Sequence, residues 1–177
     1  MTVHIKEFPG TALSRKDFEE GRVLFTTWDP NARYAWDAGV AIGRYLAELK
    51  NGRLIGRKCR KCRRIMIPPR MFCEHCFRPT DEWVYLQDTG TVLTFSLCYV
   101  TWDVKRVKEP LIPAVIEIDG ASKGMGIMHL LGEVEPEEVK IGMRVKAVWK
   151  PPEEREGAIT DIKYFKPMTN ASMTNDQ

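Results

Sequence analysis

The chain has 177 residues, of which 44% are hydrophobic and 29% charged, values that exclude a mainly disordered protein. This length suits one ordinary domain or two small modules that share an interface. The formal net charge of +3 is too small to indicate nucleic-acid binding by itself. No apolar run approaches the roughly 20 residues that span a bilayer, and the first ten residues lack signal-peptide features. We therefore expect a soluble, cytoplasmic protein without a membrane contact.

Residues 1–52 are predicted to form an N-terminal extension with helices. Ser14 can cap a short first helix that Gly21 ends. A second, amphipathic helix is predicted over residues 37–50 from its helical spacing. Its apolar face contains Ile42, Tyr45, Leu46 and Leu49, and its polar face contains Arg44, Glu48 and Lys50. We expect the apolar face to pack on the chain's own core rather than on a partner.

Residues 53–80 contain two Cys-x-x-Cys pairs, and the residues between them number ten. The cysteines are Cys59, Cys62, Cys73 and Cys76. Each pair can present two thiolates to one ion, and four thiolates complete a tetrahedron with no open position for substrate. The spacing predicts one structural zinc ion in a ribbon. A rubredoxin-like iron site is the alternative, and we favour zinc because nothing else in the chain resembles a redox centre.

Basic residues are concentrated around these cysteines. They are Arg57, Lys58, Arg60, Lys61, Arg63, Arg64, Arg70 and Arg78. Four thiolates and one divalent ion leave about two negative charges, which nearby cations relieve. We favour this explanation over the second one, a site for the phosphates of a nucleic acid or a nucleotide cofactor.

Residues 81–167 carry short β patterns separated by turn formers. The predicted strands are residues 83–86, 91–100, 112–118, 125–131, 144–149 and 159–165, with a helical turn at 136–139. Asp88-Thr89-Gly90 is predicted as a turn between the first two. The fold class expected is mainly β with N-terminal helices, a rubredoxin-like zinc ribbon followed by a five-stranded OB-fold barrel. An open sandwich is the alternative, and residues 168–177 are expected to form a polar tail.

No self-contained active site is recognisable in the sequence. His75 lies inside the second cysteine pair, where four thiolates already fill the metal shell. His129 and Cys98 lie in strand patterns, and a hydrolase that uses either of them is disfavoured because no triad partner can be named.

Several motifs occur together in an order that resembles a known family. They are Gly52-Arg53-Leu54-Ile55-Gly56, the two cysteine pairs, Pro68-Pro69-Arg70 and Thr89-Gly90-Thr91-Val92. This order resembles the zinc-ribbon and OB-fold proteins of domain of unknown function 35, and residues 141–145 and 162–167 match as well. Many members have Gly after the second cysteine and Pro after the third, whereas this chain has Arg63 and Glu74.

The resemblance implies a partner more than an activity. Members of the family are similar in being small, noncatalytic subunits of acyl-CoA enzymes, mostly thiolases. The resemblance therefore implies a hetero-oligomer in which a thiolase-like subunit carries the chemistry and this chain organises its active site. Contact with acyl-CoA is also implied, and its candidate residues are Arg60, Lys61, Arg63, Arg64 and Trp102, because cations and aromatic rings suit phosphates and adenine.

A single-stranded nucleic-acid-binding module is the alternative function, since ribbons and OB barrels both bind strands. The acidic residues along the barrel argue against it. They include Glu133, Glu135, Glu137, Glu138, Glu153, Glu154 and Glu156.

Overall fold

The computed structural model describes residues 13–24, 26 and 34–168. The chain divides into two compact units, Met1–Trp36 and Asp37–Gln177. In the first unit, helix α1 (Arg15–Glu19) begins after Ser14, as the sequence predicts. The Ser14 N–H donates to Asp17 Oδ2 at 2.7 Å, which satisfies a backbone donor that precedes the helix.

The second unit begins with helix α2 (Gly39–Lys50). Tyr45 and Leu49 are buried, so the helix packs on the chain's own core as expected. Glu48, predicted on the polar face, is instead buried. Its carboxylate accepts from the Tyr85 hydroxyl at 3.1 Å and pairs with Arg53 at 2.7 Å. These two partners offset the cost of burying the charge.

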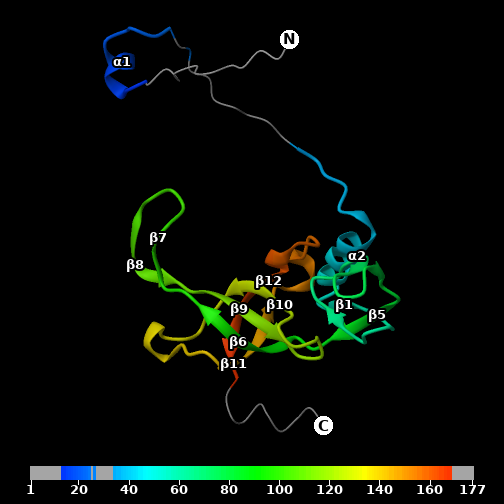
Figure 1. The fold of residues 1–177 in the computed structure, drawn as a ribbon. Helices are drawn as coiled ribbons and strands as arrows, with labels where there is room; N and C mark the ends of the chain where they lie inside the picture. Colours follow the sequence, from blue (N-terminus) through cyan, green and yellow to red (C-terminus); the bar gives the residue numbers. More distant parts are fainter. Residues whose placement is uncertain (1–12, 25, 27–33, 169–177) are drawn as a thin grey trace, which may run out of the picture. The chain divides into compact units, whose positions relative to one another are not determined.

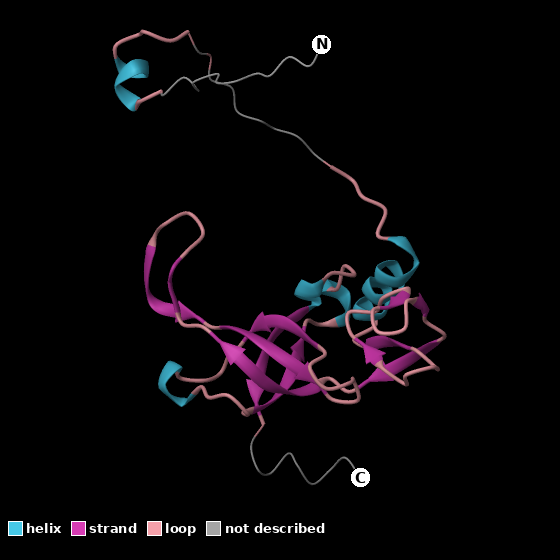
Figure 2. Ribbon diagram, viewed as in Figure 1, coloured by secondary structure: helices cyan, strands magenta, loops and turns pink. Residues whose placement is uncertain are grey.

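The zinc-ribbon region follows α2 and contains short strands. Its three-stranded sheet has the order β2-β1-β5, and β3 and β4 form a separate hairpin. The strands are β1 (Leu54–Lys58), β2 (Ile65–Met66), β3 (Phe72–Cys73), β4 (Arg78–Pro79) and β5 (Glu82–Leu86). Figure 2 shows how little regular structure the ribbon contains beside the barrel.

Five strands then form the OB-type barrel that the sequence predicts (Figure 1). They are β6 (Thr89–Phe95), β9 (Pro113–Ile118), β10 (Gly126–Leu130), β11 (Arg144–Trp149) and β12 (Ile162–Pro167). Their order is β10-β9-β6-β11-β12, and every neighbouring pair is antiparallel. A parallel bridge between Leu131 and Phe165 joins the two outer ends of this order, so the sheet closes on itself.

Three short 3-10 helices lie in the connections of the barrel. They are η1 (Pro136–Glu138), η2 (Pro152–Glu154) and η3 (Ile159–Asp161). Helix η1 occupies the predicted helical turn. Helix η3 replaces the first part of the strand predicted over residues 159–165, and the Asp161 side chain accepts from the backbone N–H groups of the preceding loop.

The predicted strand over residues 91–100 is two strands. A bulge between Val92 and Thr94 ends the regular alternation in β6, and the chain then leaves the barrel as β7 (Cys98–Val100), which pairs with β8 (Arg106–Leu111). Val92 is buried, whereas Leu93, the next residue, is 38% exposed. Figure 1 shows the β7–β8 hairpin projecting from the barrel.

Gly90 lies within β6 and not in the predicted turn. A Cβ at this position would come within 2.3 Å of the Glu117 carbonyl oxygen of β9. Glycine is therefore required by the close approach of two strands rather than by a turn.

Helix α2, the ribbon and the barrel share one hydrophobic core. Fully buried side chains from all three regions belong to the same cluster, among them Leu49, Ile55, Met66, Ile116 and Phe165. No helix in the described part of the chain is long and apolar enough to cross a membrane. Of the predicted tail, only Met168 is described, and its N–H donates to Arg144 O at 2.9 Å.

Candidate metal centre

The four cysteines of the two Cys-x-x-Cys pairs lie together, with all of their sulfur atoms within 4.8 Å of one another. Cys62 Sγ and Cys73 Sγ are 3.6 Å apart. A disulfide needs about 2.0 Å, whereas a tetrahedron with metal–sulfur distances of about 2.3 Å has edges of about 3.8 Å. The donor set therefore fits one four-coordinate ion and not a pair of disulfides.

Each pair lies on a tight backbone turn. The Cys59 N–H donates to Arg64 O at 2.9 Å, and the Phe77 N–H donates to Cys73 O at 2.9 Å. The residues that follow the second cysteine of each pair, Arg63 and Phe77, have positive φ values of 63° and 49°. This left-handed conformation turns the chain back so that both sulfurs of a pair face one point.

The cysteine thiols of the cluster differ in how readily they lose their protons. The backbone N–H of Cys62, with that of Lys61, lowers the pKa of the Cys59 thiol to about 6. Burial raises the pKa of Cys73, and burial with the neighbouring sulfurs raises the pKa of Cys76 to about 12. Four thiolates so close together require a divalent ion, which stabilises all of them as anions.

Most of the surrounding basic side chains form ion pairs with carboxylates. Arg60 pairs with Glu82 at 2.6 Å, and Arg64 pairs with Glu74 at 2.8 Å. Arg78 binds Asp81 at 2.8 Å and places its guanidinium 3.9 Å from Cys59 Sγ. Sequence reasoning missed these acidic partners, although Glu74 lies directly after Cys73 among the basic residues and could have drawn attention. The pairs favour charge compensation as the role of much of the basic cluster.

Arg57 has a different structural role. It is buried, donates through Nε to Thr80 Oγ1 at 2.9 Å, and lies 4.7 Å from the centre of the Trp83 ring. Arg44 of α2 also lies over Trp83, at 4.6 Å. These cation–π contacts connect α2 to the ribbon.

The structure does not bring the five candidate coenzyme A residues into one site. Arg60 and Arg64 are ion-paired, and Lys61 and Arg63 are exposed beside the cysteines. Trp102 is 96% exposed near the tip of the β7–β8 hairpin. Figure 1 shows this hairpin on the side of the barrel away from β1 and β5.

The two histidines and the fifth cysteine that the sequence analysis weighed and disfavoured as catalytic residues lie apart from the cysteine cluster or at its surface. His75 is exposed within the second pair. His129 Nε2 lies 3.2 Å from Ile159 O, and His129 Nδ1 accepts from the Leu130 N–H at 2.9 Å, so both ring nitrogens have backbone partners. Cys98 begins β7 and lies 3.7 Å from Ser96 Oγ.

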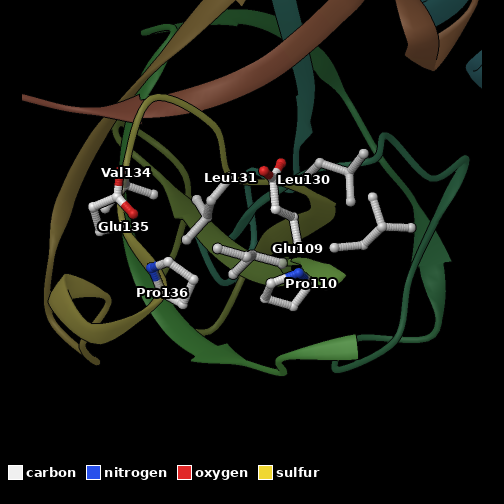
Figure 3. Close-up of a pocket in the computed structure, with 9 residues that line it drawn as sticks. Glu109, Pro110, Leu130, Leu131, Val134, Glu135 and Pro136 are labelled. Carbon is white, nitrogen blue, oxygen red and sulfur yellow. The ribbon is translucent and has the colours of Figure 1, made fainter. Parts of the chain in front are cut away.

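A hollow of about 350 Å³ lies between the base of β8 and the loop that leads to η1. Figure 3 shows Glu109 and Pro110 on one side of it, with Val134, Glu135 and Pro136 on the other. Both glutamates are exposed. The residues that line the hollow include no cysteine, serine, histidine or lysine that a carboxylate could activate, so this place lacks the elements of an active site.

Fold and site together define a zinc-ribbon protein with an OB-fold barrel. Comparison with known families agrees: residues 46–82 match the ChsH2 rubredoxin-like zinc ribbon domain, and residues 83–150 match the ChsH2 C-terminal OB-fold domain. The ribbon model covers all four cysteines of the cluster, and the cofactor of this chain is one zinc ion.

Two curated relatives are DUF35 domain-containing scaffold proteins. The one from Methanocaldococcus jannaschii is 34% identical over 120 residues, which is 66% of this chain and 83% of the relative. The one from Methanothermobacter thermautotrophicus is 25% identical over 119 residues, which is 66% of this chain and 87% of the relative. The chain belongs to the DUF35 family.

Two solved structures are similar to this fold. A DUF35-family protein of unknown function from Sulfolobus solfataricus gives a TM-score of 0.54 at 29% identity, covering 62% of this chain and 78% of its own. The Ltp2-ChsH2(DUF35) aldolase gives a TM-score of 0.53 at 21% identity, covering 76% of this chain and 98% of its own. At that identity the second similarity concerns the fold alone.

Proposed function

We propose that this chain is a noncatalytic, zinc-stabilised subunit that organises the active site of a thiolase-type acyl-CoA enzyme. Two relatives bear the name scaffold protein, and one similar fold occurs in a structure described as an Ltp2-ChsH2(DUF35) aldolase. The observation that carries the proposal is the β7–β8 hairpin. Its exposed apolar side chains include Tyr99, Val100, Trp102, Val104 and Leu111.

An exposed apolar arm of this kind suits a protein–protein contact. The side chains of Trp102 and Val104 are 96% and 81% exposed. Large apolar and aromatic side chains gathered on one projecting element typically mark an interaction site. A partner that covers the hairpin would hold this subunit in a fixed position, and its own loops and substrate would be held in reactive geometry.

The proposal extends to the acyl-CoA substrate of the partner enzyme. The segment Trp36-Asp37-Ala38-Gly39 resembles the branch of the family that accompanies bacterial thiolases for unusual acyl groups, such as benzoylsuccinyl-CoA thiolase. In this proposal the exposed cations Lys61 and Arg63 are the residues free to contact the phosphates of coenzyme A from the partner's site.

Isolation of the assembled complex tests the proposed function. The full chain with a C-terminal tag is purified at low salt from the cells that make it, and mass spectrometry identifies the chain that accompanies it in fixed stoichiometry. We expect a thiolase-type catalytic chain. Absence of such a chain, together with tight single-stranded DNA binding that weakens steeply with salt, would favour the nucleic-acid alternative.

The ligand assignment is part of the proposal. Cys59, Cys62, Cys73 and Cys76 hold the zinc ion as thiolates, and the ion replaces the core that so short a segment lacks. Cys73→Ser should lower zinc content well below one equivalent and unfold the ribbon. Cys98→Ser is the matched control, because Cys98 lies in β7 outside the cluster. Metal analysis that shows a full equivalent in Cys73→Ser, or a loss in Cys98→Ser, would contradict the assignment.

A further inference from the structure

Strand β10 has one unpaired edge in the described part of the chain. At the ends of its ladder with β9, Ile118 N donates to Met125 O at 3.3 Å and Leu131 N donates to Ile112 O at 2.9 Å. Bonded and non-bonded pairs alternate in an antiparallel ladder, so the odd-numbered residues from 125 to 131 face β9. Met128, like the other even-numbered residues of β10, therefore presents its backbone N–H and C=O to the opposite side.

Elements of the barrel cover this opposite side only in part, as far as the described residues go. The bridge between Leu131 and Phe165 joins β10 to β12 at one end. Next to it, the Leu130 N–H donates to the neighbouring His129 ring, which in turn contacts the carbonyl of Ile159. Beyond His129, residues 126–128 form no further backbone hydrogen bond on this side within the described chain. Met128 is 72% exposed.

The open edge lies along a groove between α2 and β10, which we call the α2–β10 groove. It consists of two hollows of about 340 and 490 Å³ that share Met128 and Ile159. Ile42 and Leu46 of α2 form one wall, so the side chains beside the free backbone groups are mostly apolar. Lys150 and Lys163 line the other hollow, and neither forms an ion pair with a described carboxylate.

Tyr45 adds an unsatisfied donor to the same groove. Its side chain lines the smaller hollow and is 4% exposed, yet its hydroxyl has no hydrogen-bond partner among the described residues. Burial raises the pKa of Tyr45 to about 12, so the hydroxyl keeps its proton and remains a donor. A buried donor without an acceptor destabilises the structure, and a backbone carbonyl entering the groove would remove that cost.

We propose that the α2–β10 groove binds an extended segment of the partner chain as an added strand beside β10. Such a segment offers alternating N–H and C=O groups to Met128, apolar side chains to Ile42, Leu46 and Ile159, and an acidic side chain to Lys150 and Lys163. A backbone carbonyl of the segment accepts from Tyr45. A helical partner segment would already use its backbone N–H and C=O groups internally and could not pair with the edge of β10. An extended partner segment is therefore favoured.

The proposal rests on the proposed function in one respect, that the segment belongs to the catalytic chain. Amide hydrogen exchange at single-residue resolution tests it on the isolated chain and on the complex. In the isolated chain the Met128 amide should exchange at least about tenfold faster than those of Ile127 and His129. In the complex, exchange at Met128 should slow by at least about tenfold.

Other outcomes of the exchange experiment test the proposed strand pairing and the proposed function separately. Unchanged exchange at Met128 in a complex with a thiolase-type chain overturns the inference and leaves the function standing. Slowed exchange with a different partner supports the inference and removes the function. Slowing with coenzyme A alone, or with rising concentration of the isolated chain, overturns the inference in favour of a small molecule or a second copy. Purification of the chain with no partner overturns both.

A pair of substitutions provides an independent test. Met128→Pro removes only an N–H that faces away from β9, so the barrel ladder is kept, whereas Met128→Leu keeps the N–H and an apolar side chain. We expect Met128→Pro to weaken the complex about tenfold and Met128→Leu to leave it within about threefold. Equal affinities for the two variants would contradict the proposed strand pairing, and circular dichroism with zinc content verifies that both are folded.

Discussion

Individual residues around the cysteines decide how well the zinc ribbon is held. Arg63 occupies the left-handed region, with φ of 63°. The sequence shows only that Arg63 directly follows Cys62. It does not reveal Glu74, Asp81 and Glu82 as partners of the cations, because these contacts depend on the turns that bring the two cysteine pairs together.

The strain at Arg63 makes a prediction about stability. A non-glycine residue in the left-handed region costs about 1–2 kcal/mol. Arg63→Gly should therefore raise the free energy of unfolding of the zinc-loaded chain by about 1 kcal/mol. Arg63→Ala removes the charge and keeps the Cβ, so it should bring no such gain. Denaturant unfolding measures both, and an equal gain in the two variants would assign the effect to charge instead.

At the scale of elements, the approximate positions of the barrel strands were predictable and the β7–β8 hairpin was not. Alternating apolar residues and turn formers mark the barrel strands. The hairpin lacks these signals: its tip has Val104 at φ of 63° where glycine or asparagine is usual, and β8 contains Pro110 and several charged residues. The bulge after Val92 could not be predicted from the sequence either. One extra residue changes which side chains of β6 face the core without changing the amino-acid composition of the strand.

The loop before η3 makes the fold depend on pH. Asp161 is buried and accepts backbone N–H bonds from Glu156, Gly157 and Ala158 at 3.0, 2.8 and 3.1 Å. Burial alone would raise the pKa of Asp161, but these donors outweigh it and hold the pKa below its ordinary value. The contribution to stability is therefore present above about pH 4 and is lost as the pH falls through the lower, folded-state pKa.

Asp161→Asn should lower the free energy of unfolding at pH 7 by about 2 kcal/mol, because a charged acceptor of several bonds is lost. The difference from the unsubstituted chain should shrink as the pH falls below about 4. Glu153→Gln, at an exposed position of η2, is the matched control and should have little effect. Denaturant unfolding between pH 2 and 7 measures this, and a constant difference across that interval would refute the role of Asp161.

The hairpin makes a prediction that separates folding from association. Trp102→Ala should leave the stability of the isolated chain within about 0.5 kcal/mol, because the side chain is 96% exposed. It should weaken the complex with the catalytic chain about tenfold or more. Ile141→Ala, at a 68% exposed position of another loop, is the control and should not weaken it. Calorimetric titration measures both affinities, and an unchanged affinity for Trp102→Ala would remove the hairpin from the interface.

At the scale of the whole molecule, a continuous core connects the metal-binding ribbon to the barrel. The buried residues of α2, the ribbon and the barrel form one cluster, so the zinc site is part of the same packed unit and not a detached finger. The cysteine spacing and the strand patterns were sufficient to predict the ribbon and the barrel. The free edge of β10 could not be predicted, because it depends on where β12 separates from β10 after a single bridge.

If this chain acts through another polypeptide, it should have no activity of its own. Acyl-CoA thioester turnover tests this when it is measured in parallel for the zinc-loaded chain alone and for the purified complex. We expect turnover by the complex and none above the buffer rate by the isolated chain. Turnover by the isolated chain, freed of every companion protein, would show instead that this chain is itself a catalyst.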